Sequence, residues 1–175
     1  MKKAIFIILA IVLFIMPCVV WTCGIVKEIQ FSANCGDYLK MAADANSIDI
    51  AEKHLTSAVD YLEKNNLTSG YTKIFVYYPK NNIGLWYENL KSAQTQLRYM
   101  QGTDYTELEE SNMLMKLRET ILDENGSLTH PEGISMAPNY TMMFWLMVFL
   151  WVPCWIAGGF AIYNAVSYKR KRIWR

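Results

Sequence analysis

Residues 4–26, AIFIILAIVLFIMPCVVWTCGIV, form an apolar stretch that contains no charged residue. An α-helix rises about 1.5 Å per residue, so this stretch is long enough to cross a hydrocarbon core of about 30 Å. A second apolar stretch covers residues 141–167. The sequence therefore predicts two transmembrane helices, with one domain of residues 27–140 between them.

The charged residues are distributed unevenly along the chain. Residues 27–140 contain all 16 Asp and Glu residues and ten of the 17 Lys and Arg residues, which gives this segment a net charge of −6. The other seven basic residues lie in residues 1–3 and 168–175. Cytoplasmic flanks of membrane spans are enriched in Lys and Arg. We therefore expect two cytoplasmic tails, with residues 27–140 outside a bacterial inner (plasma) membrane.

The first apolar stretch fits either a cleaved signal peptide or an uncleaved signal anchor. Two lysines followed by an apolar run are typical of a signal peptide. However, an uninterrupted run over residues 4–26 is longer than an ordinary signal core, and the candidate cleavage sites are poor. We therefore favour an uncleaved signal anchor.

The expected fold is all-α, with about four helices in the middle domain. Small and apolar residues step alternately by four and three from Cys18 to Ala43, so the first span should continue as one helix to about residue 45. Gly36 and Leu39 on this seam are candidate packing positions, against a neighbouring helix or a second copy of the chain. Apolar periodicity predicts further helices over residues 48–65, 83–101 and 107–123.

Two local motifs refine these helices. Thr106 and Glu109 have the spacing of a capping box at the start of the last helix. The apolar arc of that helix is wide and comprises Leu108, Leu114, Met115, Leu117, Ile121 and Leu122. Residues 71–78, YTKIFVYY, read as a short strand or, more favourably, as an ordered loop that covers the bundle.

A group of aromatic residues is a candidate interaction site. Tyr and Trp are enriched at binding hot spots, so an exposed contact patch is one interpretation. A small domain also needs its aromatic residues for its core, and this interpretation is favoured. The residues are Phe75, Tyr77, Tyr78, Trp86 and Tyr87.

Arg118 falls inside the apolar arc of the last helix on a helical wheel. A side chain that reaches solvent, or an ion pair with a neighbouring helix, is the favoured explanation. The alternative is that Arg118 faces a protein partner or an anion.

No catalytic, cofactor or metal site is predicted. His54 and His130 have no Cys, Asp or Glu at a recognised metal-ligand spacing. Cys23 and Cys35 would be separated by about 18 Å along one helix, which is too far for a disulfide. Nucleic acid is not an expected partner, because the folded domain is acidic.

The second span contains a ladder of small residues, Ala157, Ala161 and Ala165. Ladders of this kind allow membrane helices to pack closely. Neither span contains Asp, Glu, Lys, Arg or His, which argues against a pump or a proton-coupled transporter.

Three stretches resemble an uncharacterised group of bacterial two-span membrane proteins with a helical extracytoplasmic domain. These are residues 38–46 (YLKMAADAN), 61–68 (YLEKNNLT) and 111–120 (SNMLMKLRET). The resemblance implies no function. The layout also resembles the sensory half of chemoreceptors and sensor kinases, but nine residues after residue 166 are too few for a signalling module.

The leading hypothesis is a non-enzymatic, membrane-anchored interaction or accessory protein that acts through its outer domain. Its expected partners are membrane lipid and another membrane or extracytoplasmic protein, and a homodimer remains open. One alternative is a receptor-like sensor that signals through another protein. The other is a phage or mobile-element membrane protein for lysis or exclusion.

Overall fold

The computed structural model describes most of the middle of the chain and part of the apolar segments. The chain divides into two compact units, one of Met1–Gly24 with Thr141–Arg175 and one of Ile25–Tyr140. The described residues are 15, 18, 19, 21–73, 75, 77–137, 145, 148, 149, 151–153, 156 and 157.

Most of the two predicted spans, residues 4–26 and 141–167, lies outside the described residues. Within the part of the chain that is described, no helix combines the length and the apolar character needed to cross a membrane. The two-span arrangement and its topology therefore stay predictions.

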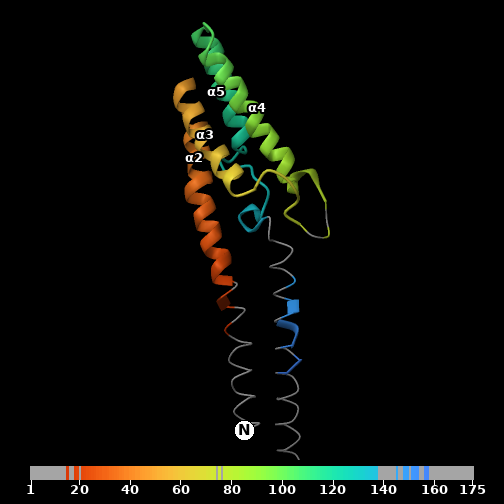
Figure 1. Cartoon of the computed structure of the whole chain (residues 1–175). Coiled ribbons are helices and arrows are strands. Elements are labelled where there is room, and N and C mark those ends of the chain that lie inside the picture. The colour runs from red at the N-terminus through yellow and green to blue at the C-terminus, as the bar shows by residue number, and fades with distance from the viewer. Residues whose placement is uncertain are drawn as a thin grey trace, which may run out of the picture. The chain divides into compact units, whose positions relative to one another are not determined.

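The unit of residues 25–140 is helical, which confirms the predicted all-α class (Figure 1). Residues 21–31 are helical and lead directly into a π-helical turn, Ser32–Gly36, and then into α2, Asp37–Ala43. The remaining helices are α3 (Ile48–Lys64), α4 (Ile83–Gln101) and α5 (Glu107–Ile121), with short 3₁₀ turns at Pro79–Asn81 and Ile134–Met136.

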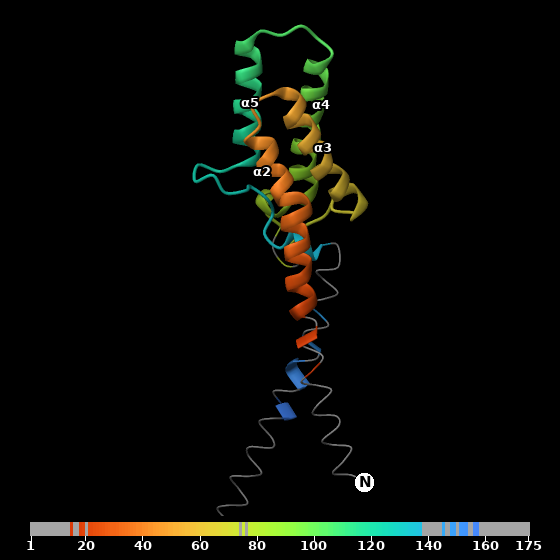
Figure 2. The same cartoon turned by 90° about the vertical axis from the view of Figure 1, so that its left-hand side faces the viewer.

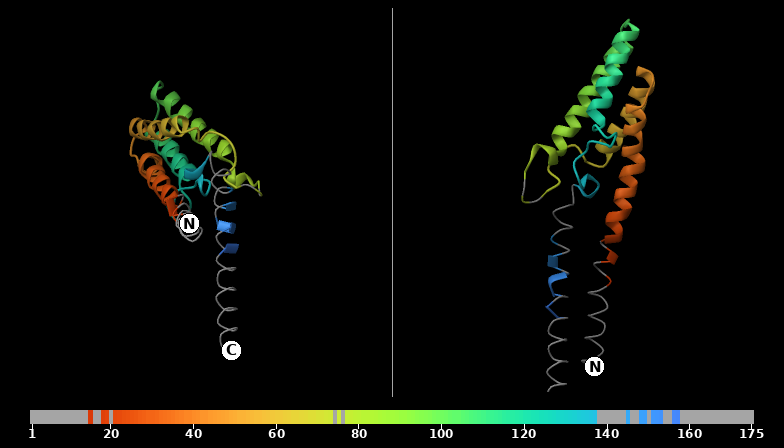
Figure 3. Two further views of the ribbon diagram at one scale, coloured as in Figure 1. Left: turned by 60° about the horizontal axis from the view of Figure 1, so that its bottom comes forward. Right: turned by 180° about the vertical axis from the view of Figure 1, so that it is seen from behind.

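The four α-helices form a closed bundle. α3 packs against both α2 and α4, and α5 packs against α2 and α4 on the other side of the bundle (Figure 2). The turn of residues 102–106 between α4 and α5 lies at one end of this unit, which we call the far end (Figure 3). This arrangement confirms the predicted helical bundle.

The core includes the apolar stripes that the periodicity predicts for α3 and α4, together with buried residues of α2, α5 and the returning segment, residues 128–137. Every third or fourth residue on one face of α3 is fully buried, because that face lies between two neighbouring helices. The buried apolar residues are Ile48, Ala51, Leu55, Ala58, Val59 and Leu62 in α3, and Ile83, Trp86, Leu90, Ala93 and Leu97 in α4.

The predicted wide apolar arc of the last helix is only partly buried. Leu117, Ile121 and Leu122 are buried and Leu114 is half-buried, but Leu108 and Met115 are exposed. α5 meets the bundle along one narrow face, so only part of the arc can reach the core. The helix also ends at Ile121, two residues before the predicted boundary.

The helix starts combine predicted and unpredicted caps. The capping box of Thr106 and Glu109 is present, as predicted. Ser47 precedes α3 but makes no side-chain cap. The backbone N–H of Ile48 instead donates to Oε1 of Glu110 at 3.2 Å, so the first turn of α5 caps α3.

A ladder of polar contacts joins α3 to α4 in one antiparallel register. The contacts pair successive positions along α3 with positions that lie the same number of residues earlier along α4. The buried amide of Gln94 donates to Oγ1 of Thr56 at 2.6 Å, which satisfies a polar group inside the interface. The other contacts are Gln101 Nε2 to Asp49 Oδ1 (2.9 Å), Arg98 Nε to Glu52 Oε1 (2.7 Å) and Tyr87 Oη to Glu63 Oε1 (2.6 Å).

The core predicts a sharp difference between two leucine truncations. Leu97→Ala should lower the free energy of unfolding by about 2–5 kcal/mol, because it leaves a cavity at a fully buried position. The exposed Leu108→Ala should change it by less than about 0.5 kcal/mol. Denaturant unfolding of the full chain in detergent, followed by far-ultraviolet circular dichroism, measures both. Equal losses would mean that the helix phases are wrong.

The ladder also predicts a loss of stability in acid. Burial alone would raise the pKa of Glu52, but hydrogen bonds from Arg98 and Thr56 bring the pKa below its ordinary value of 4.5. Glu52 therefore binds a proton more readily in the unfolded chain than in the folded chain. Its ionised carboxylate stabilises the fold above about pH 4.5, and this stabilisation is lost as the pH falls through the lower pKa of the folded chain.

Melting temperatures of wild type and Glu52→Gln across the acid range test this linkage. The variant should have a lower melting temperature than wild type at neutral pH, and its melting temperature should fall less on acidification. Part of the fall should remain in the variant, because the pKa values of Glu63 and Glu109 are also lowered. Glu88→Gln, at an exposed position of α4, is the control and should keep the wild-type profile. An unchanged profile for Glu52→Gln would contradict the assignment.

Candidate functional site

The two ends of the described domain leave the bundle at one place. Oε2 of Glu28, near the start of the first helix, accepts a hydrogen bond from the hydroxyl of Ser135. The ring of Phe31 lies 5.5 Å from the ring of His130, centroid to centroid. Residues 25–31 therefore lie beside the returning segment 128–137, at the end opposite the turn 102–106 (Figure 1). We call this the exit end.

Residues 71–78, the aromatic loop, also belong to the exit end. Nζ of Lys73 forms an ion pair with Oε2 of Glu132 at 3.3 Å, which holds the loop beside the returning segment. Two backbone hydrogen bonds close its base, from Thr72 N–H to Asn81 and from Ile83 N–H to Gly70. The residues that precede and follow the loop are therefore paired at its base, between α3 and α4.

Three aromatic side chains of this loop are exposed. Phe75, Tyr77 and Tyr78 are 71%, 66% and 62% accessible. The favoured expectation that they cover the core is wrong for these three residues, because most of the surface of each is accessible to solvent. The rings of Tyr71 and Tyr77 meet edge to face, with centroids 4.9 Å apart.

Trp86 and Tyr87 serve the fold instead. The indole N–H of buried Trp86 donates to the carbonyl of Thr129 at 2.7 Å. The Tyr87 hydroxyl donates to Glu63 at 2.6 Å, and this hydrogen bond raises the pKa of Tyr87 to about 12. The five predicted aromatic residues therefore separate into an exposed group on the loop and two residues committed to packing.

Arg118 forms an ion pair rather than entering the core. Its Nη1 lies 3.3 Å from Oδ1 of Asp44, across α5 and the end of α2, and both side chains are exposed. This geometry agrees with the favoured interpretation of an ion pair with a neighbouring helix.

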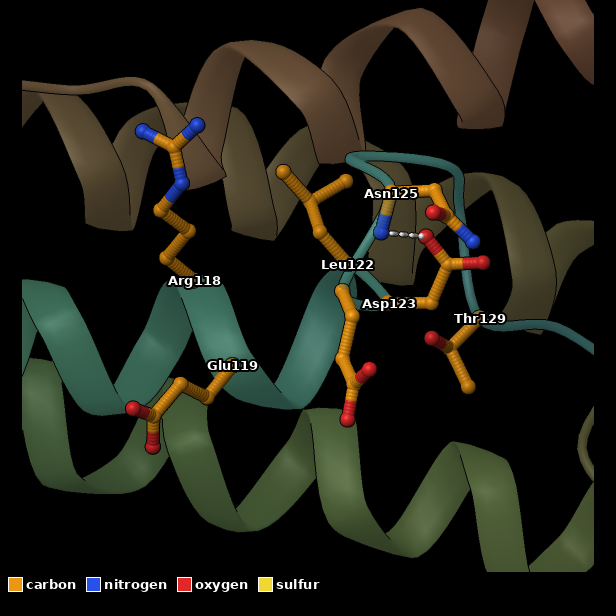
Figure 4. A pocket seen from close by; sticks show the side chains of 7 residues that line it. Arg118, Glu119, Leu122, Asp123, Asn125 and Thr129 are labelled. Carbon is orange, nitrogen blue, oxygen red and sulfur yellow. Dashed lines mark hydrogen bonds between the residues drawn. The ribbon is translucent and has the colours of Figure 1, made fainter.

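A pocket of about 740 Å³ lies beside Arg118, at the end of α5 and the turn after it (Figure 4). The side chains of Arg118 and Glu119 point to different sides of α5 in this view. The Asp123 carboxylate accepts hydrogen bonds from the backbone N–H groups of Asn125 and Ser127, at 2.9 and 2.8 Å, and so stabilises its own turn. The charged groups of this pocket do not converge on a common point.

Only two of the predicted packing residues, Gly36 and Leu39, pack within the described domain. Leu39 is buried in the core, and a Cβ on Gly36 would lie 3.2 Å from Cδ1 of Leu128. This part of the seam therefore packs within the domain, against the returning segment. Ala157 is exposed, whereas Ala161 and Ala165 lie outside the described residues.

The two histidines pack against aromatic rings. The His54 ring lies 6.1 Å from that of Tyr38, and His130 contacts Phe31. Over the described ranges, no group of three or more His, Cys, Asp or Glu residues is placed to hold a metal ion.

The far end carries an exposed apolar group that sequence analysis missed. Tyr99 and Leu108 are 73% and 69% accessible. Met115, at the middle of α5, is also exposed. Leu108 and Met115 are seven residues apart, which places them on one face of α5, roughly opposite Leu117. Choosing Leu117 and Ile121 as the core face would have revealed this group from the sequence. The carboxylates of Asp104 and Glu107 lie beside Leu108 in the chain and are exposed.

Comparison of the chain with known protein families, with curated proteins and with solved structures finds no match. A function can therefore be inferred only from the chain's own geometry.

Cys35 is the one buried thiol among the described residues, in the π-helical turn. Within one chain, Cys23 and Cys35 are both free thiols. Sγ of Cys35 lies 4.0 Å from the carbonyl oxygen of Ala58, and burial raises its pKa to about 12. A thiol that stays protonated is a poor nucleophile.

Cys35 should therefore resist alkylation in the folded chain at neutral pH and react only after denaturation. Iodoacetamide treatment with and without denaturant, followed by peptide mass spectrometry, measures this. Rapid labelling of Cys35 in the folded chain would contradict its burial.

Proposed function

We propose that this protein is a membrane-anchored, non-enzymatic interaction protein, with the helical bundle outside a bacterial inner membrane. The observation that carries the proposal is the convergence of both chain connections at the exit end, through Glu28 and Ser135. Each connection leads toward an apolar segment long enough to span a bilayer. Two anchors at one end would leave the far end projecting away from the membrane.

The far end has the character of a contact surface for a protein. Tyr99 and Leu108 expose apolar area, and exposed Asp104 and Glu107 add negative charge close to Leu108 in the chain. Two further carboxylates of this end are already used, Glu109 in its capping box and Glu110 at the start of α3. We therefore propose a partner protein with a basic contact face, since complementary charge favours specific encounter.

The sensor alternative would need a ligand pocket with converging polar groups. The pocket beside Arg118 is the strongest candidate for such a site. Its arginine already pairs with Asp44, and its Asp123 already stabilises a turn. These contacts favour an interaction protein over a ligand receptor.

Crosslinking in intact cells, with an amine-reactive reagent that cannot cross membranes, tests the proposal. Lysines within residues 27–140 should react, whereas Lys169 and Lys171 should not, because the tails would be cytoplasmic. Mass spectrometry should identify one dominant foreign protein, with basic residues at the crosslinked face.

Leu108→Gln should reduce that crosslink several-fold without lowering the melting temperature, because it removes exposed apolar contact area. Leu85→Gln is the matched control: Leu85 is also an exposed leucine in a first helical turn, but on α4 near the exit end. Labelled tails would contradict the topology. An unchanged crosslink in Leu108→Gln would contradict the contact surface.

A further inference from the structure

The aromatic loop exposes three large aromatic side chains that do not contribute to the core of the bundle. Phe75, Tyr77 and Tyr78 are each more than half accessible, whereas Trp86, a few residues later, is buried. Burying a large apolar side chain is worth about 1.5–3 kcal/mol relative to leaving it in water. Three such residues at one loop tip therefore indicate a surface that is covered in the functional state.

The position of the loop indicates what covers it. Lys73 and Glu132 join the loop to the returning segment, a few residues before the second apolar stretch begins. Glu28 and Ser135 join that segment to the first helix, directly after the first apolar stretch. The loop therefore lies at the exit end of the bundle, where residues 25–31 and 128–137 meet. The far end, with the turn of residues 102–106, lies at the opposite end of this unit (Figures 2 and 3).

The chemistry of the loop suits a lipid headgroup layer. Tyr71, Tyr77 and Tyr78 combine an apolar ring with a hydroxyl group, and such residues are enriched at membrane–water interfaces. Lys80 is exposed directly after the loop. Lys27 and Lys64 line a polar pocket of about 330 Å³ that also includes Ser135. Basic residues near a bilayer are attracted to anionic headgroups.

We propose that the aromatic loop inserts into the headgroup region of the bilayer and forms a third contact between the bundle and the membrane. This proposal rests on the proposed membrane anchoring. Phe75, Tyr77 and Tyr78 would bury their rings at the boundary with the acyl chains. The bundle would then be held in one orientation, so that the far end points toward its partner.

Photo-crosslinking of the full chain in vesicles of phosphatidylethanolamine and phosphatidylglycerol tests the proposal. Benzoylphenylalanine replaces Phe75 or Tyr77 in separate preparations. Tyr99 is the matched control, because it is an aromatic residue of similar exposure at the far end. Mass spectrometry then measures the fraction of each chain that carries a covalent phospholipid, and vesicle flotation shows whether the chain is anchored.

Positions 75 and 77 should give several-fold more phospholipid adduct than position 99 in chains that float with the vesicles. Floating chains with equal adducts at the three positions would overturn this inference and leave the anchoring intact. Crosslinks from position 75 or 77 to a second copy of the chain, in place of lipid, would also overturn it. Chains that fail to float would overturn the anchoring and this inference together.

Discussion

The bundle depends on burying one face of α3 against its neighbours. The apolar residues from Ile48 to Leu62 on this face are fully buried, and two of them, Ala51 and Ala58, are small enough to let adjacent backbones approach. The gain from such burial grows with the apolar area removed from water. α2 and α4 supply the two flanks, and α5 holds the start of α3 through Glu110.

Polar side chains around this core mostly fix geometry. Gln94, Thr56, Glu52 and Arg98 satisfy one another between α3 and α4, because a buried amide or carboxylate without a partner is costly. These four side chains therefore hold α3 and α4 in register. Exposed aromatic and apolar side chains, among them Phe75 and Tyr77 in the aromatic loop and Tyr99 and Leu108 near the far end, lie outside this core.

Helical periodicity was a good guide where a helix lies between two others. For α3 and α4 it identified the buried residues, because each of these helices packs against two neighbours and its apolar face must lie between them. For α5 it succeeded only in part, because the six apolar residues of the predicted arc spread widely around the helix axis and Leu108 and Met115 do not face the bundle. Phe75 and Trp86 were grouped because they are close in the chain, but one lies on a closed loop and the other on a buried helix face.

Local patterns were sufficient to predict the helix positions, the capping box at Thr106, the two long apolar stretches and the acidic character of the middle segment. These properties depend on residues within a few positions of one another. The exposure of the aromatic loop, the contact of Gly36 with Leu128 and the convergence of Glu28 with Ser135 could not be predicted in this way. They arise when helices distant in sequence pack together, and packing is set by the whole bundle's shape rather than by any single segment.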